Sequence, residues 1–160
     1  MKLRKEHGMW RSPFTREYGL ELPFISAGMG FVALPELVAA VSNAGGLGLL
    51  GVAPAPAQLM HEMVSRTKSL TTRPFGVDLI VEETAFGPCT TEQHIEVCLA
   101  ERVPVVVFFW HLPPRDWVTR LHAGGAKVWM TARLPHRQYG FPWHDPNAET
   151  RRSIPSDGNY

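Results

Sequence analysis

The feature that most constrains the fold is a repeated alternation of short apolar runs with helical segments, which extends from Leu22 to Met130. Glycine or proline separates these segments, and no hairpin signal lies between successive apolar runs. Strands that alternate with helices in this way form parallel sheets through right-handed crossovers. The predicted strands are 22–26, 47–50, 75–79, 103–109 and 126–130, and the predicted helices are 35–44, 54–70, a segment beginning at Thr90 or Thr91, and 113–123.

Two parallel architectures are compatible with this alternation. One is an open, doubly wound α/β sheet of about five strands, as in flavodoxin-like proteins. The other is the TIM-type (β/α)8 barrel, which typically takes about 250 residues. The chain has 160 residues, and the local pattern does not choose between an open sheet and the first part of a barrel.

Composition favours a globular protein that acts on small molecules. Hydrophobic residues make up 44% of the chain, charged residues 19%, and the formal net charge is +1. Because Lys and Arg are scattered, nothing indicates binding to nucleic acid or to an acidic membrane surface. The apolar run 103–110 is too short to span a membrane, and the charged residues 1–19 show no secretory signal. We therefore expect a cytoplasmic protein with neither nucleic acid nor membrane as a partner.

Cysteine and histidine spacings do not indicate a metal site. Cys89 and Cys98 lie nine positions apart without a C-x-x-C motif, and Cys98 falls on an apolar helical stripe. His136, His144 and Asp145 have no spacing typical of metal ligands. No bound metal is expected.

Two glycine-rich segments carry different information. Residues 46–51 match the letters G-x-G-x-x-G, but they follow a predicted helix and form the next strand, so a structural role is favoured. Residues 26–30, Ser-Ala-Gly-Met-Gly, instead follow the carboxyl end of the first predicted strand, where parallel α/β folds bind ligands. Small side chains there let the backbone approach a flat ligand, although a plain flexible turn explains the same residues about as well.

Polar and aromatic residues mark the later strands. Asp78 is a carboxylate within the apolar strand 75–79, where it requires a hydrogen-bond donor from a ligand or from its neighbours. Residues 108–111, Phe-Phe-Trp-His, end the fourth predicted strand at the same mouth. Trp110 could line a planar ligand and His111 could act as an acid or base, although core packing more often explains such a cluster.

These segments together resemble one family. Residues 24–30, 35–48 and 73–79 strongly resemble the opening of the nitronate monooxygenases, formerly called 2-nitropropane dioxygenases. The resemblance continues through 103–110 and 121–124, and it covers about four-fifths of the chain in order. A collinear series of this length is specific, whereas each motif alone is not.

The resemblance implies an FMN-dependent (β/α)8 barrel that oxidises alkyl nitronates with O2 to a carbonyl compound and nitrite. It also implies that Asp78 lies near the flavin, at a position where many members carry an Asn that bonds to it. From their place at the end of the fourth predicted strand, we expect Trp110 and His111 to belong to the substrate pocket. The backbone contacts to the flavin are implied at Ala27, Gly28, Met29 and Gly30. Related FMN enzymes act on other substrates, such as the enoyl reductases of fatty-acid synthesis, so the substrate is not fixed.

The family pattern ends at Met130. Residues 131–160 contain four prolines, no helical or strand period, and no counterpart of the family's segment that supplies the active-site His. No catalytic residue is therefore assigned. We predict that residues 1–130 form the N-terminal part of the FMN-binding barrel and that 131–160 form an irregular tail, from a truncated or frameshifted reading frame.

An incomplete barrel has physical consequences. Five strands would leave two open sheet edges, so we expect self-association, weak FMN binding and little turnover. Two alternatives stay open at this point. One is a compact, flavodoxin-like electron carrier, and the other is a non-enzymatic half-barrel that associates with itself.

Overall fold

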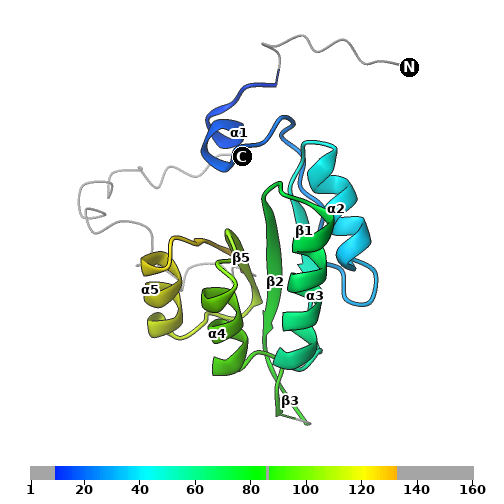
Figure 1. Cartoon of the computed structure of the whole chain (residues 1–160). Helices are drawn as coiled ribbons and strands as arrows, with labels where there is room; N and C mark the ends of the chain where they lie inside the picture. The colour runs from blue at the N-terminus through cyan, green and yellow to red at the C-terminus, as the bar shows by residue number, and fades with distance from the viewer. Residues whose placement is uncertain (1–9, 86, 133–160) are drawn as a thin grey trace, which may run out of the picture.

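A computed structural model of the chain describes residues 10–85 and 87–132 (Figure 1). Within these residues the elements, in chain order, are α1 (Pro13–Tyr18), α2 (Pro35–Asn43), β1 (Gly48–Gly51), α3 (Ala57–Leu70), β2 (Phe75–Val81), β3 (Glu83–Thr84), β4 (Gly87–Pro88), α4 (Glu92–Ala100), β5 (Val105–Trp110), α5 (Arg115–Ala123) and β6 (Lys127–Ala132). Strands β1, β2, β5 and β6 form the main sheet, and β3 pairs with β4 in a separate antiparallel ribbon.

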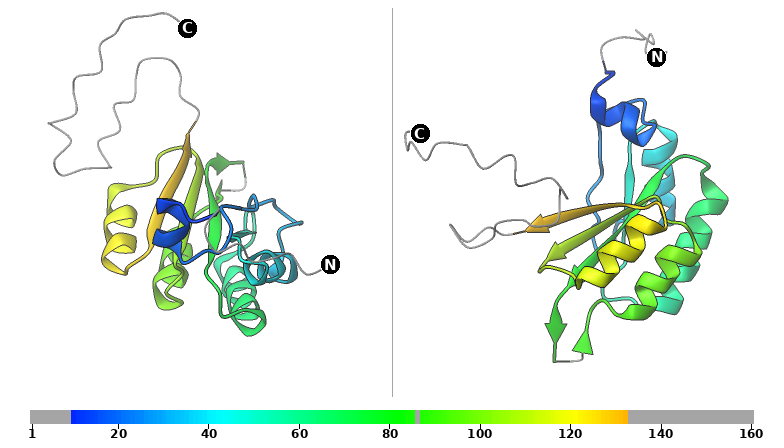
Figure 2. Two further views of the ribbon diagram at one scale, coloured as in Figure 1. Left: turned by 90° about the horizontal axis from the view of Figure 1, so that it is seen from above. Right: turned by 90° about the vertical axis from the view of Figure 1, so that its left-hand side faces the viewer.

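The strands of the main sheet lie side by side in the order of the chain, β1-β2-β5-β6. Every pairing between them is parallel, and a parallel bridge from Ile25 to Leu47 continues the sheet beyond β1. A doubly wound sheet reverses its strand order and carries helices on both faces. Here the order does not reverse, and α2 to α5 lie on one face (Figure 2). The described residues are therefore an arc of a (β/α)8-type barrel, and the flavodoxin-like alternative is wrong.

The two faces of the sheet carry separate apolar clusters because strand side chains alternate between faces. Val77 and Phe108 pack with buried residues of α2 to α5 in the larger core. Leu49, Val105 and Val107 form a smaller cluster on the opposite face, which is the interior of a barrel. The interior face is the one that also carries Asp78, the neighbour of Val77 along β2.

Local sequence signals account for the helix starts. Pro35 begins α2, where its missing N–H is not needed, and Glu36 lies near the positive end of the helix dipole. Thr91 caps α4 together with His94, whose Nδ1 accepts from the Thr91 N–H at 3.1 Å. The Nε2 of the same buried ring therefore donates to the carbonyl of Ala55 at 2.9 Å. His94 has both ring nitrogens bonded and serves the fold.

Several predicted boundaries are corrected by the structure. The first predicted strand, 22–26, is reduced to the bridge at Ile25, because it has a paired neighbour on one side and leaves Phe24 72% exposed. Helix α2 begins at Pro35 as predicted, whereas α3 begins at Ala57 rather than Pro54 and α5 at Arg115 rather than Pro113, each after a proline-containing turn. The predicted tail begins too early, since Thr131 and Ala132 belong to β6. Residues 133–160, including His136, His144 and Asp145, lie outside the described part.

Helix α1 was not predicted, because the sequence before Gly19 shows charge rather than an apolar period. Ser12 and Thr15 form a reciprocal capping box at its start, and Gly19 ends it in a left-handed conformation at φ 66°. Tyr18 packs against the interior cluster, and its hydroxyl accepts from the Trp129 indole N–H at 2.7 Å. The helix therefore covers part of the interior face of the sheet.

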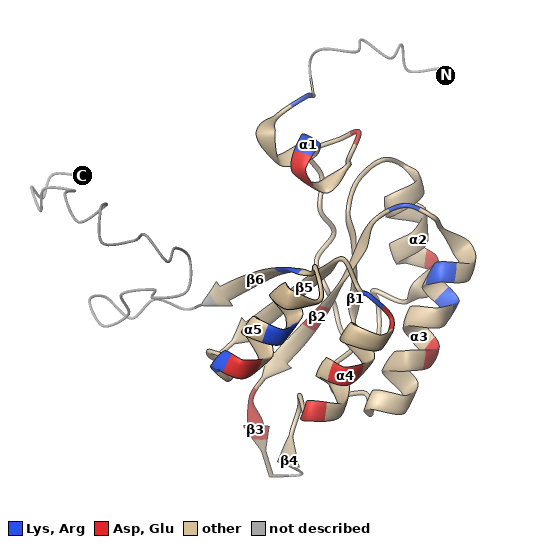
Figure 3. Ribbon diagram, turned by 60° about the vertical axis from the view of Figure 1, so that its left-hand side comes forward, with Lys and Arg blue, Asp and Glu red and all other residues tan. Residues whose placement is uncertain are grey.

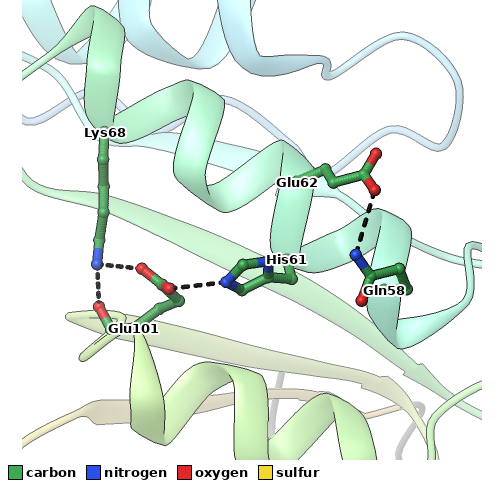
Figure 4. A network of polar contacts seen from close by, with 5 residues as sticks. All are labelled: Gln58, His61, Glu62, Lys68 and Glu101. Carbon is green, nitrogen blue, oxygen red and sulfur yellow. Dashed lines mark hydrogen bonds and ion pairs between the residues drawn. The ribbon is translucent and has the colours of Figure 1, made fainter.

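Charged side chains stabilise the outer surface in small mixed groups, as the interspersed colours on α3 and α5 show (Figure 3). Glu101, which follows α4, contacts Lys68 at 2.6 Å and His61 at 3.0 Å, both on α3 (Figure 4). The hydrogen bond from Lys68, assisted by its charge and by His61, lowers the pKa of Glu101. Such exposed pairs contribute about 1 kcal/mol or less each, so apolar packing carries most of the α3 to α4 contact.

Candidate functional site

The loop formed by residues 26–30 leaves the sheet at the carboxyl end of the first strand. Ser26 makes the last ladder contacts, since its N–H donates to the Leu47 carbonyl at 3.0 Å. Its hydroxyl also accepts from the N–H of Leu49 at 3.1 Å, which replaces a strand hydrogen bond with a side-chain one. The chain then turns across the end of β1, where parallel barrels bind their ligands.

Glycine is required in this loop because the backbone packs directly on the strands. A side-chain methyl on Gly28 would lie 2.5 Å from Asp78 Oδ2 and closer still to the Asp78 Cβ. On β1, a methyl on Gly51 would overlap the backbone of Met29 and lie 2.8 Å from the Gly30 nitrogen. The loop backbone thus packs on the backbone of β1 at Gly51 and on the Asp78 side chain of β2.

Asp78 lies in the middle of β2, between Gly51 of β1 and Val107 of β5. Its Oδ1 is buried, and no hydrogen-bond partner for it exists among the residues that the structure describes. Burial raises the pKa of the Asp78 carboxyl from 3.8 to about 6. Because natural folds bond nearly all buried polar atoms, an orphaned carboxyl oxygen at a strand mouth indicates a missing ligand.

The loop offers hydrogen-bond donors next to this carboxyl. Within residues 10–85 and 87–132, the N–H groups of the loop residues 27–30 have no protein acceptor. The Met29 carbonyl, in contrast, accepts from Ala33 at 2.8 Å and so fixes the turn. The arrangement can hold a flat polar ring by backbone donors on one side and a carboxyl group on the other.

The predicted pocket residues Trp110 and His111 lie at the same end of the sheet as Asp78, but they are not part of the contact between Gly28 and Asp78. Trp110 pairs in register with Val81, three positions beyond Asp78 on β2, and has a positive φ of 78°. The exposed His111 places its Nε2 3.0 Å from Glu82 Oε2. The structure therefore brings Gly28 and Asp78 together, whereas Trp110 and His111 form a rim without a contact to either.

Sequence reasoning missed three residues of this region. Gly51 had been assigned to an ordinary strand, yet it is the surface on which the loop rests. Ile80 and Phe109 follow Asp78 and Val107 by two positions and pair with each other, so by alternation they continue the interior face toward the mouth. The period of two along 75–81 and 105–110 was the signal that could have identified them.

A family comparison decides the relationship of this site to known proteins. The model of the nitronate monooxygenase family matches residues 11–133. The chain belongs to the nitronate monooxygenase family. The matched residues contain the loop, Asp78, Trp110 and His111.

Curated relatives include oxidoreductases of two names. A "(3aS,4S,5R,7aS)-5-hydroxy-7a-methyl-1-oxo-octahydro-1H-indene-4-carboxyl-CoA dehydrogenase" from Mycobacterium tuberculosis is 34% identical over 74% of this chain and 32% of its own length. The nitronate monooxygenase of Pseudomonas aeruginosa is 29% identical over 76% of this chain and 44% of its own. The chain thus spans between about a third and under half of the length of these relatives.

Solved structures show the same arc of barrel. FabK from Thermotoga maritima superposes with a TM-score of 0.67 at 31% identity, over 76% of this chain and 37% of that one. Nitroalkane oxidase from Streptomyces ansochromogenes gives 0.66 at 28% identity, over 74% and 42%. The partial (β/α)8 barrel that the family resemblance implied is therefore confirmed.

The described residues also bear on metal binding and membrane insertion. Among them, no group of three or more His, Cys, Asp or Glu side chains is placed to hold a metal ion. None of the helices that the structure describes has the length and hydropathy needed to cross a bilayer.

Proposed function

We propose that this chain is part of an FMN-dependent oxidoreductase that oxidises alkyl nitronates with O2, releasing a carbonyl compound and nitrite. Family membership supports oxidoreductase chemistry, and relatives named nitronate monooxygenases support this substrate class. The observation that carries the proposal is the buried Asp78 Oδ1, which has no partner among the described residues and faces the loop at Gly28.

The residues present fit a flavin ring. A flat heterocycle with both donor and acceptor atoms matches the N–H groups of residues 27–30 and the carboxyl of Asp78. Glycine at position 28 keeps the backbone low enough for the ring to approach the carboxyl, as a side chain would fill that space. When bound, FMN would supply the redox chemistry that side chains cannot perform.

The chain's own residues would bind and orient. The loop donors and Asp78 would fix the ring across the interior face, and the apolar side chains of Ile80 and Phe109 would exclude water beside it. Trp110 and His111 would form the outer wall where substrate approaches. We propose a cytoplasmic location for this activity, with the small-molecule nitronate and O2 as its partners.

A second candidate has its own support. The Mycobacterium tuberculosis relative named as a carboxyl-CoA dehydrogenase is 34% identical, compared with 29% for the nitronate monooxygenases. The same flavin site would then serve oxidation of a CoA thioester. The two candidate functions share the cofactor and differ in the substrate, so one experiment can distinguish them.

That experiment adds FMN to the purified 160-residue chain and then tests each substrate class without O2. Bleaching of the flavin absorbance by an alkyl nitronate, followed by nitrite release when O2 is admitted, is the expected result. Bleaching by an acyl-CoA alone would favour the second candidate. Failure to bind FMN by equilibrium dialysis would refute both, and Gly28→Ala, which fills the space against Asp78, serves as the matched variant.

A further inference from the structure

Asp78 is the ionisable group most sharply at odds with its surroundings. Its Oδ1 is buried without a partner among the described residues, and its side chain faces the backbone of Gly28. Every element packed against it presents an uncharged group at this level: Gly28 from the loop, Gly51 from β1 and Val107 from β5. No ion pair and no hydrogen bond to the Asp78 side chain is formed among the described residues, so a carboxylate here would be uncompensated as the chain stands.

The charged side chains at the two ends of the sheet form ion pairs with residues other than Asp78. Glu82, just past β2, pairs with His111 at 3.0 Å. Lys127, at the start of β6, pairs with Glu17 of the first helix at 2.8 Å. Consistent with this, burial accounts for the raised pKa of Asp78, to which no neighbouring charge contributes. A ligand that covers Asp78 removes more water from it and favours the uncharged form further.

We propose that Asp78 binds the flavin ring as a neutral carboxylic acid, which donates and accepts like an amide, so that flavin binding takes up a proton. This inference rests on the proposed flavin site and adds its regulation by pH. One oxygen of the Asp78 carboxyl group carries the proton and donates it in a hydrogen bond to the ring. The other oxygen accepts a hydrogen bond from a ring N–H or from a loop N–H. Affinity is then highest in acid and falls as the free carboxyl ionises.

If Asp78 bound the flavin as an ionised carboxylate, the affinity would depend on pH in the opposite direction. A carboxylate that accepts from a ring N–H would bind more tightly as pH rises through the carboxyl titration, and no proton would be taken up. The absence of any ion pair or hydrogen bond that would hold a carboxylate at Asp78, among the described residues, argues against that form. The two forms therefore differ in the sign of the pH dependence, which is measurable.

The test uses riboflavin rather than FMN as the first probe. The phosphate of FMN has its own second pKa of about 6, which would obscure a carboxyl that titrates in the same range. Riboflavin has the same ring and no phosphate. Its dissociation constant is measured by fluorescence quenching on the full chain from about pH 5 to about pH 8, and proton uptake is measured by calorimetry in buffers of different ionisation enthalpy.

In the native chain we expect the dissociation constant to rise above about pH 6, by up to about tenfold for each pH unit, with about one proton taken up near neutrality. Asp78→Asn keeps the size and the hydrogen-bonding atoms but does not ionise, so its affinity stays constant and its proton uptake falls to zero. Asp116→Asn, at an exposed carboxylate of α5, is the control and keeps the native pH dependence.

The outcomes separate this inference from the proposed function. Binding that weakens equally with pH in the native chain and in Asp78→Asn overturns the inference and leaves the flavin site in place. Binding that tightens with rising pH also overturns it. If neither FMN nor riboflavin binds any of the folded variants at any pH, the proposed function fails, and the inference fails with it.

Discussion

The backbone of Gly28 lies directly against the side chain of Asp78, which therefore joins the loop after the first strand to the middle of β2. The two residues are 50 positions apart in the chain, and parallel strand pairing through Gly51 brings them together. Within residues 10–85 and 87–132, the Asp78 Oδ1 at this contact is buried and has no hydrogen-bond partner. Sterics and electrostatics at this point can therefore be tested separately.

Replacing Gly28 with Ala tests the steric part. The added methyl would overlap the Asp78 Cβ and lie 2.5 Å from Oδ2, so the loop or β2 must move. We expect a loss of about 1–3 kcal/mol in the free energy of unfolding, measured with urea, and loss of flavin binding. In an Asp78→Gly background the overlap is absent, so Gly28→Ala should cost clearly less there. Equal costs in both backgrounds would mean that the contact is not tight.

The pH dependence of stability tests the electrostatic part. The pKa of Asp78 is raised to about 6 in the folded chain, from 3.8, so the folded state binds this proton more tightly than the unfolded state. Its destabilising effect is therefore absent below about pH 4, grows as pH rises, and is complete above about pH 6. Asp78→Asn should exceed the native chain in stability by about 1–2 kcal/mol near pH 8, after allowance for solvent screening of this half-buried group.

That difference should disappear near pH 4, where both side chains are uncharged. Urea unfolding of both proteins at several pH values measures it, and taking the difference cancels the titration of all other carboxyl groups. A constant gap across this range would show that Asp78 titrates at its ordinary value and that its burial is not maintained in solution.

The strand and helix alternation was predictable because each unit carries its own local signals. Val105 to Val107 are apolar on both faces, which is typical of a buried parallel strand, and the Thr91 cap marks the start of α4. The choice between barrel and open sheet was not predictable from the pattern, since it depends on which strands pair. Sequential pairing, and with it the one-sided placement of the helices, appears only in three dimensions.

The candidate site, like the fold, could be predicted from the sequence only in part. The sequence identified the glycine loop and Asp78 as separate candidates, and their contact depends on register that no local pattern encodes. Gly51 was missed because a strand glycine has several explanations until its neighbour is known. Whether Trp110 and His111 line a substrate pocket stays a prediction, because they contact neither Gly28 nor Asp78 in the structure.

The two cysteines should differ in reactivity. Burial raises the pKa of the Cys98 thiol to about 12, so the reactive thiolate is scarce, whereas Cys89 is half-buried in the turn before α4. A thiol-specific chromogenic reagent should modify Cys89 in the folded chain and Cys98 only after unfolding in urea. Cys89→Ser should then abolish the native reaction, and Cys98→Ser should leave it unchanged. Rapid native labelling in Cys89→Ser would show that the core around Cys98 opens.

The attachment of α1 depends on a hydrogen bond that a double-mutant cycle can isolate. The Trp129 indole N–H donates to the Tyr18 hydroxyl at 2.7 Å, and the two rings meet edge to face with centroids 5.2 Å apart. Tyr18→Phe keeps the ring contact but leaves the half-buried indole N–H without this acceptor, so we expect a loss of about 1–2 kcal/mol in urea unfolding. In a Trp129→Phe background the same substitution leaves no donor unpaired and should cost less than half as much. Equal losses in the two backgrounds would mean that the Tyr18 hydroxyl contributes independently of Trp129, so that this hydrogen bond does not hold α1 on the interior face of the sheet.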